Sequence, residues 1–264
     1  MNKKIGVLVS MALFFIVVVS ASIGRQLLPK KERPIVKPQT IQQLAFDYDK
    51  RLGFTVYLEE EGVLEPYYVV TKDYFSQGNT LLLRKYVWED YMWHQEENFT
   101  SYYAQSIPDR FMNAEFIHKL SKVLQEIIPV TTFPIAPTRG EDERAAEWIK
   151  RRIFLLSPYE LGNRHGRYGE LEERLDFFVE DSFVYRLATL PDGTPASWWL
   201  RNVARTEYVL AGYMSYEGKF GLGWIVTPSY VRPAFTLPPE TKITQTEHHG
   251  EAVYVLDLSE EDNE

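Results

Sequence analysis

Apolar positions between residues 113 and 128 recur every three or four residues, which is the spacing of one face of a helix. Pro129 follows directly and predicts the end of that helix. Weaker patterns of the same kind predict three more helices, which cover Thr40 to Leu52, Glu141 to Arg151 and Leu171 to Val179.

Shorter apolar runs bounded by turn residues predict strands. Thr55 to Leu58 and Tyr67 to Thr71 form a pair around a turn at Glu61-Gly62. Ile153 to Leu156 is apolar throughout and predicts a buried strand. Further expected strands are Thr80 to Val87, Val130 to Ile135, Trp198 to Leu200, Tyr208 to Met214, Gly223 to Thr227, Val231 to Leu237 and Val253 to Leu258. This mixture predicts one α+β domain over residues 40–258.

The amino-terminal segment, residues 1–24, is a candidate signal peptide or transmembrane anchor. Residues 5–24 carry no charge and are long enough to cross a bilayer. Val19-Ser20-Ala21 is an acceptable cleavage pattern, but the length of the apolar run favours an uncleaved anchor. Residues 25–39 are basic and contain prolines, which predicts an extended stalk, and residues 259–264 form an acidic tail.

The orientation across the membrane has two opposing indications. Five basic residues follow the apolar segment within the stalk, against two before it, and the positive-inside rule alone would place the carboxyl side in the cytoplasm. The layout of the leader favours export instead. We therefore expect a single-pass cell-membrane protein with an extracytoplasmic domain, or alternatively a secreted protein.

Composition excludes several classes of chemistry. The chain has no cysteine, which removes disulfides, thiolate catalysis, zinc–thiolate sites and a lipid anchor on cysteine. The net charge of −8, without an evident basic patch, predicts no nucleic-acid partner. Aromatic residues make up 14% of the chain, which suits either a core of large rings or an aromatic binding surface.

The candidate binding residues are Trp198, Trp199, Arg201 and Arg232. In a strand, Trp199 and Arg201 share one face and Trp198 and Leu200 share the other, so we expect one face to be core and one to line a groove. A tryptophan platform beside an arginine could grip a sugar or a carboxylate. We favour a structural role for both arginines, each paired with a carboxylate or with backbone carbonyls, because an unpaired buried guanidinium is costly.

No metal site, cofactor or catalytic set is expected. His248 and His249, with Glu247 and Glu251, have suitable residue types for metal binding, but adjacent histidines point apart in an extended chain. The many carboxylates mark no pair that faces a cleft, which a glycoside hydrolase would need. Ser157 lies outside a nucleophile-elbow context.

Three strings resemble, in order, the motifs of an uncharacterised domain family common in exported proteins of Gram-positive bacteria. Ile153 to Glu160 resembles its "V-F-L-L-S-x-x-E", Trp198 to Arg201 its "W-W-L-R-S-P", and Val231 to Ala234 its "G-V-R-P-A". Two segments earlier in the chain, Thr80 to Lys85 and Ile107 to Asn113, also resemble parts of this family's pattern. The resemblance covers about residues 66–237 and implies that the three strings share one core.

The chain departs from this pattern at two places. Asn202-Val203-Ala204 replaces Ser-Pro-Gly, and Tyr230 replaces the glycine before Val-Arg-Pro. The order of the motifs is more distantly similar to C-type-lectin-like domains of the sulfatase-modifying-factor kind, which implies a mixed domain with a long irregular loop region. Without cysteine, the thiol or copper–thiolate chemistry of that enzyme is excluded.

The expected function is non-catalytic binding or assembly at a bacterial cell surface, with a cell-wall glycan or another surface protein as partner. One alternative is a cell-wall or glycan-acting enzyme with an unidentified carboxylate pair, which would show two converging carboxylates with perturbed pKa values. The other is an accessory subunit of a membrane complex, which would show an exposed apolar patch.

Export is tested by protease treatment of intact protoplasts. We expect the chain from Thr40 onward to be digested, because the leader has the layout of a signal segment. Full protection of the domain, together with its digestion after lysis, would place it in the cytoplasm.

Overall fold

The computed structural model describes residues 37–47, 55–96, 101–136, 146–163, 174–178, 184–203 and 209–257. The expected membrane segment, most of the stalk and the acidic tail lie outside these residues. Within the described ranges, no helix has both the length and the apolar character that a bilayer crossing needs.

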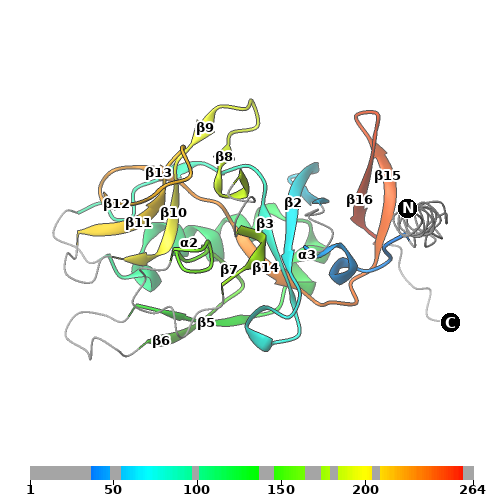
Figure 1. Cartoon of the computed structure of the whole chain (residues 1–264), viewed down its shortest axis with the longest axis horizontal. Coiled ribbons are helices and arrows are strands. Elements are labelled where there is room, and N and C mark those ends of the chain that lie inside the picture. Colours follow the sequence, from blue (N-terminus) through cyan, green and yellow to red (C-terminus); the bar gives the residue numbers. More distant parts are fainter. Residues whose placement is uncertain are drawn as a thin grey trace, which may run out of the picture. The chain divides into compact units, whose positions relative to one another are not determined.

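A seven-stranded mixed sheet carries the first half of the domain and its carboxyl end (Figure 1). Its order is β15-β16-β1-β2-β3-β14-β7, and β1 pairs with β16 in parallel while the other neighbours are antiparallel. The strands are β1 (Thr55–Glu60), β2 (Val63–Thr71), β3 (Thr80–Arg84), β7 (Ile153–Phe154), β14 (Ala234–Leu237), β15 (Ile243–His248) and β16 (Glu251–Leu256).

The predicted pair of strands around Glu61-Gly62 is confirmed. β1 and β2 are joined by these two residues, both with positive φ, which is the backbone of a tight hairpin turn that favours glycine.

A five-stranded mixed sheet is built mostly from residues 198–230, with the order β12-β11-β10-β13-β4. β10, β11 and β12 form an antiparallel meander, and β10 pairs with β13 in parallel. The strands are β4 (Asp90–Tyr91), β10 (Trp198–Val203), β11 (Leu210–Met214), β12 (Phe220–Trp224) and β13 (Ser229–Tyr230). Two-stranded sheets pair β5 (Thr131–Ile135) with β6 (Glu147–Arg151), and β8 (Ala188–Thr189) with β9 (Pro195–Ala196).

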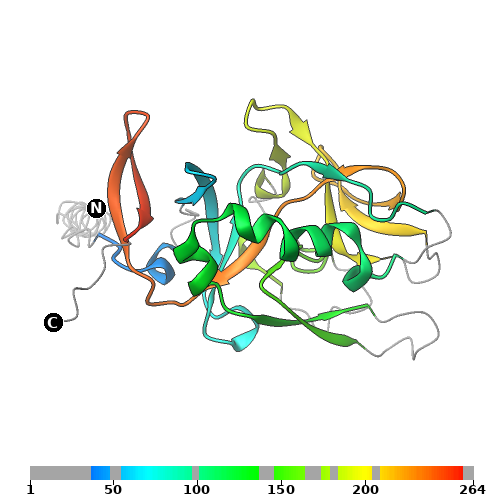
Figure 2. The ribbon, with the colours of Figure 1, turned by 180° about the vertical axis from the view of Figure 1, so that it is seen from behind.

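The helical segment is short and interrupted, and Figure 2 shows it in front of the central strands. It consists of α2 (Ile107–Ala114), a 3₁₀ turn (Phe116–Lys119) and α3 (Lys122–Ile127). Other 3₁₀ helices cover Ile41–Leu44, Tyr74–Ser76, Tyr103–Gln105 and Asp176–Phe178.

The prediction of one continuous helix from 113 to 128 is wrong. Leu120 is extended because it forms a β-bridge with Glu60 at the end of β1. Ser121 then caps a new helix, since its Oγ accepts a hydrogen bond from the backbone N–H of Leu124 at 3.4 Å. Backbone groups that would form hydrogen bonds within a continuous helix therefore pair with the sheet instead.

Two other predicted helices are also corrected. Residues 147–151 form strand β6, paired with β5 at five successive positions, and Ile149 alone of the five is buried. Residues 137–145 lie outside the described part. The predicted helix from Thr40 to Leu52 is described only as far as residue 47. In that part Ile41–Leu44 forms a 3₁₀ turn, and it ends because Phe46 donates its backbone N–H to Val69 of β2.

The domain is therefore a mainly-β mixed domain with two mixed sheets and one short bent helix, which confirms in part the α+β domain predicted from the sequence. One apolar cluster joins the elements, and it contains residues of all three strings that the resemblance placed in a shared core: Ile153 to Leu156, Trp198 to Leu200, and Val231, Ala234 and Phe235. That prediction is confirmed.

Close packing of β11 on β10 leaves no room for a side chain at Gly212. A Cβ there would lie 2.7 Å from the carbonyl oxygen of Asn202, which is backbone and has little freedom to move. We expect Gly212→Ala to destabilise the full-length chain by roughly 1–3 kcal/mol through overpacking. Thermal melts measure this, with Thr244→Ala on the exposed face of β15 as control. Equal melting temperatures for the two variants would contradict the packing described.

Candidate functional site

Arg201 lies on β10 with its side chain fully buried, and it forms an ion pair with the equally buried Glu160. The two terminal nitrogens of Arg201 donate to the two carboxylate oxygens of Glu160, each at 2.8 Å. One of these nitrogens also donates to the carbonyl of Leu155 at 3.1 Å. The predicted pairing of Arg201 with a buried acid is therefore confirmed.

A local turn fixes Glu160 in place. The backbone N–H of Ser157 donates to the Glu160 carboxylate at 2.7 Å, and the N–H of Glu160 donates to Ser157 Oγ at 3.2 Å. This is the reciprocal geometry of a capping box. The hydroxyl of Tyr74 donates to the same carboxylate, and burial raises the pKa of Tyr74 well above its usual value. The phenol therefore stays protonated and remains a donor.

Arg232 is also fully buried, but backbone carbonyls are its hydrogen-bond partners. It donates to the carbonyls of Arg84 at 2.9 Å, Tyr185 at 3.0 Å and Lys85 at 3.2 Å. Its guanidinium lies over the ring of Trp198, 5.1 Å from the centroid. Burial lowers the pKa of Arg232, because no carboxylate offsets the loss of water. The predicted pairing with carbonyls is confirmed.

The two tryptophans are core residues in this structure. Trp198 is 0% exposed and Trp199 is 1% exposed. Trp198 Nε1 donates to the carbonyl of Arg186 at 3.1 Å, and Trp199 Nε1 donates to that of Tyr91 at 2.7 Å. Both faces of β10 are buried at these positions, so the expectation that one face lines an open groove is not met.

A second buried Arg–Glu–Tyr arrangement was not identified from the sequence. Arg84 on β3 donates to both carboxylate oxygens of Glu60, with Nε–Oε1 at 2.9 Å and Nη2–Oε2 at 3.0 Å. The hydroxyl of Tyr67 donates to the same carboxylate. The sequence did carry a signal for this second arrangement. Arg84 ends the apolar run of β3, just as Arg201 interrupts the apolar run of β10.

An open cleft of about 830 Å³ lies beside α2, next to the strand ends of β5 and β6. Its charged lining contains four cations and one carboxylate, which are Arg110, Lys150, Arg151, Arg152 and Asp109. The rest of the lining consists of His94, Ala104, Gln105, Asn113, Ala114 and Val130. The cleft is thus locally basic in a chain whose net charge is −8.

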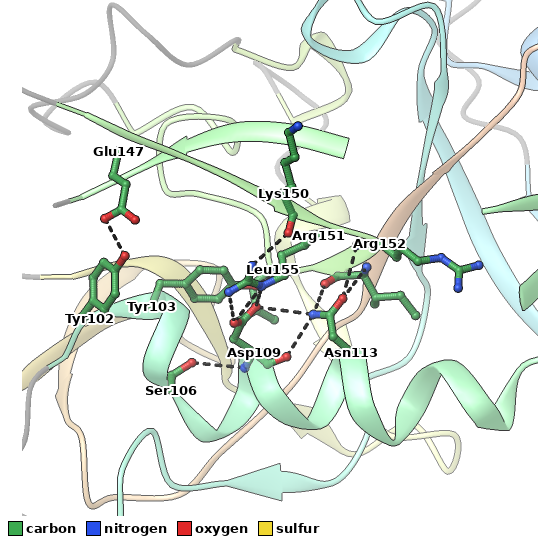
Figure 3. Close-up of polar contacts among 11 residues, drawn as sticks. Tyr102, Tyr103, Ser106, Asp109, Asn113, Glu147, Lys150, Arg151, Arg152 and Leu155 are labelled. Carbon is green, nitrogen blue, oxygen red and sulfur yellow. Dashed lines mark hydrogen bonds and ion pairs between the residues drawn. The ribbon is translucent and has the colours of Figure 1, made fainter. Parts of the chain in front are cut away.

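Asp109 and Arg151 form the ion pair at the base of this cleft (Figure 3). Arg151 Nε lies 2.8 and 2.9 Å from the two carboxylate oxygens, and its Nη2 lies 2.8 Å from Oδ2. Arg151 Nη1 donates to the carbonyl of Lys150 at 2.9 Å. Burial raises the pKa of Asp109, and the hydrogen bond and charge of Arg151 oppose that rise.

Backbone contacts hold this pair rigidly. Ser106 caps α2 by accepting the N–H of Asp109 at 3.1 Å. The side chain of Asn113 donates to the carbonyls of Asp109 and Ile153 and accepts from the N–H groups of Arg152 and Ile153. Asn113 therefore joins α2 to the corner between β6 and β7 (Figure 3).

His94 forms part of the cleft wall. Its pKa is lowered, mainly because burial disfavours the charged imidazolium and also because Arg110 repels it. The imidazole is therefore mostly neutral at neutral pH.

Among the described residues, no three His, Asp or Glu side chains lie close enough together to hold a metal ion. His248 ends β15 and His249 begins the following turn with φ of 50°.

Sequence reasoning missed the cleft because its charges come from separate segments. Asp109 and Arg110 belong to α2, whereas Lys150, Arg151 and Arg152 surround the end of β6. The available signal was the basic triplet Lys150-Arg151-Arg152 directly before an apolar strand. The helix predicted over Glu141 to Arg151 takes in most of that triplet, and a helix places these residues differently from the strand β6 that the structure shows.

Comparison with protein families matches residues 77–239 to a domain of unknown function, DUF6273. The match spans more than half of the chain, so the protein belongs to this family. All five segments on which the resemblance was based lie within the matched residues. Neither the curated proteins nor the solved structures contained a match.

The Arg201–Glu160 pair predicts a large stability effect. Arg201→Ala leaves a buried carboxylate without its cation, so we expect a loss of roughly 3–5 kcal/mol. Thermal or denaturant unfolding of the full-length chain measures it. Lys219→Ala, which breaks an exposed ion pair with Glu217, is the control and should melt like the wild type. A wild-type melt for Arg201→Ala would refute the structural role.

Proposed function

We propose that this DUF6273 protein is a non-catalytic binding module at a bacterial cell surface, with the cleft beside α2 as its ligand site. The partner is a cell-wall glycan or another surface protein. Residues 5–24 hold the protein in the membrane, and the domain faces outward. The more specific relationships, to exported proteins of Gram-positive bacteria and to the C-type-lectin-like fold, belong to the same proposal.

The cleft beside α2 carries this proposal. Its volume of about 830 Å³ falls in the range of small-ligand sites. Its lining combines exposed charged side chains with a wall that the Asp109–Arg151 pair and Asn113 hold in place. Recognition sites gain affinity from such prior ordering, because less conformational entropy is lost on binding.

The state of Asp109 favours binding over catalysis. Both of its carboxylate oxygens accept hydrogen bonds from Arg151, which stabilises the ionised form against the rise in pKa that burial causes. A glycan hydrolase uses two carboxylates on opposite sides of the scissile bond. Among the described residues that line the cleft, Asp109 is the only acid.

Location at the cell surface is supported by the sequence. The uncharged segment 5–24 is long enough to cross a bilayer, and a basic, proline-containing stalk at 25–39 would separate the domain from the lipid. The absence of cysteine suits a protein that matures without disulfides outside the cytoplasm.

The test is a steric block of the cleft that leaves its charge unchanged. Ala114 lines the cleft and is exposed at the end of α2. We expect Ala114→Phe to reduce cosedimentation of the full-length protein, kept in detergent, with cell envelopes from which the same detergent has removed the membrane lipid. The detergent prevents residues 5–24 from carrying the protein into the pellet, and the new ring occupies ligand space in the cleft.

Ala252→Phe is the matched control, since Ala252 is exposed on β16 and does not line the cleft. Both variants should melt like the wild type. If Ala114→Phe cosediments as fully as Ala252→Phe does, the cleft is not the envelope-binding site.

A further inference from the structure

We propose that the cleft binds an oligoanion, a ligand with at least two separated phosphate or carboxylate groups, through Arg110, Lys150 and Arg152. This inference rests on the proposed function, since it assigns the chemistry of the ligand to the same site.

The charge balance of the cleft is the first support. Asp109 and Arg151 neutralise each other through their ion pair, and Arg151 Nη1 is engaged with the carbonyl of Lys150. Three positive charges remain in the lining, on Arg110, Lys150 and Arg152. No described acidic side chain lies within ion-pair distance of these three cations.

The hydrogen-bond donors of these cations are the second support. Arg152 uses Nε to donate to the carbonyl of Ile128 at 3.1 Å, which anchors its stem. Its terminal nitrogens, the Arg110 guanidinium and the Lys150 ammonium donate to no described residue. Arginine and lysine side chains whose terminal nitrogens have no such partner are suited to binding oxyanions, because charge-assisted hydrogen bonds to phosphate or carboxylate are short and strong.

The spread of the cations indicates more than one anionic group. Figure 3 shows the side chains of Lys150 and Arg152 leading away from Asp109 in different directions. A single small anion cannot contact charges that diverge in this way, whereas a ligand with separated anionic groups can. The net charge of the whole chain is −8 even with these cations included, so the acidic surface outside the cleft repels a long polyanion and limits the length of the ligand.

His94 provides an internal reporter of the bound anion. Its pKa is lowered by burial and by Arg110, and a hydrogen bond with the backbone of Gln105 and the charge of Glu96 oppose this lowering. An anion in the cleft would stabilise the imidazolium, so the pKa of His94 should rise on binding. A ligand bound elsewhere on the surface would leave that pKa unchanged.

The binding experiment uses calorimetry with tripolyphosphate and citrate as oligoanions, and with inorganic phosphate and acetate as single anions. We expect at least one oligoanion to bind about tenfold more tightly than its single-anion counterpart, which is a difference of about 1.4 kcal/mol. Tighter binding of tripolyphosphate alone or of citrate alone supports the proposal and identifies the charged group. No binding, or equal binding of single anions and oligoanions, overturns it.

The variant Arg110→Gln/Lys150→Gln tests the assignment of residues. Both side chains are exposed, so the change removes two charges without disturbing the bond between Arg152 and Ile128. We expect a loss of affinity of about tenfold or more. Loss of Arg110 itself raises the pKa of His94 in the free variant, and we expect no further rise when the oligoanion is added, measured by NMR titration. Lys72→Gln/Lys122→Gln removes two exposed charges outside the cleft and is the matched control. Equal losses in the two double variants would overturn the assignment.

The outcomes separate this inference from the proposed function. If Ala114→Phe abolishes envelope binding while Arg110→Gln/Lys150→Gln retains it, the cleft is the ligand site but its ligand is not an oligoanion. If oligoanions bind but Ala114→Phe leaves envelope binding intact, the charge assignment stands and the envelope role fails.

Discussion

The buried ion pair between Arg201 and Glu160 is the contact on which the domain most depends. It joins β10 of the five-stranded sheet to the turn that follows β7 of the seven-stranded sheet. Because both side chains are completely buried, neither can return to water while the fold persists. The carboxylate also accepts from Ser157 and Tyr74, so its remaining lone pairs are satisfied. The pair thus requires that these segments meet in one relative position.

Two other buried arginines, Arg84 and Arg232, also hold separate segments of the core together, each with different partners. Arg84 engages Glu60 and links β3 to the end of β1, and Arg232 holds three carbonyls together without any acid. Aromatic rings cover the cations, since Phe133 lies over Arg201 and Trp198 lies over Arg232. A few of the core's aromatic rings therefore enclose buried guanidinium groups, and Trp198 packs with Arg232 in this way.

The proposed binding cleft lies at the surface next to this core. Asp109 and Arg151 repeat the bidentate pairing in its lining, and Asn113 connects α2 to β7 of the seven-stranded sheet. These contacts tie the wall of the cleft to the buried framework, while Arg110 and Lys150 remain exposed. The paired charges of the core support the fold, and the exposed charges of Arg110 and Lys150 are the basis for the proposal that the cleft binds a ligand.

The sequence by itself determined two local features: the β1–β2 hairpin at Glu61-Gly62 and the need of Arg201 and Arg232 for buried partners. Each depends on neighbouring residues or on the cost of an unpaired buried charge. Only the tertiary structure decided which acid pairs with Arg201, why the helix breaks at Leu120, and that 147–151 is a strand. Those outcomes, like the meeting of α2 with β6 that forms the cleft, depend on backbone partners far away in the chain, and local periodicity carries no information about them.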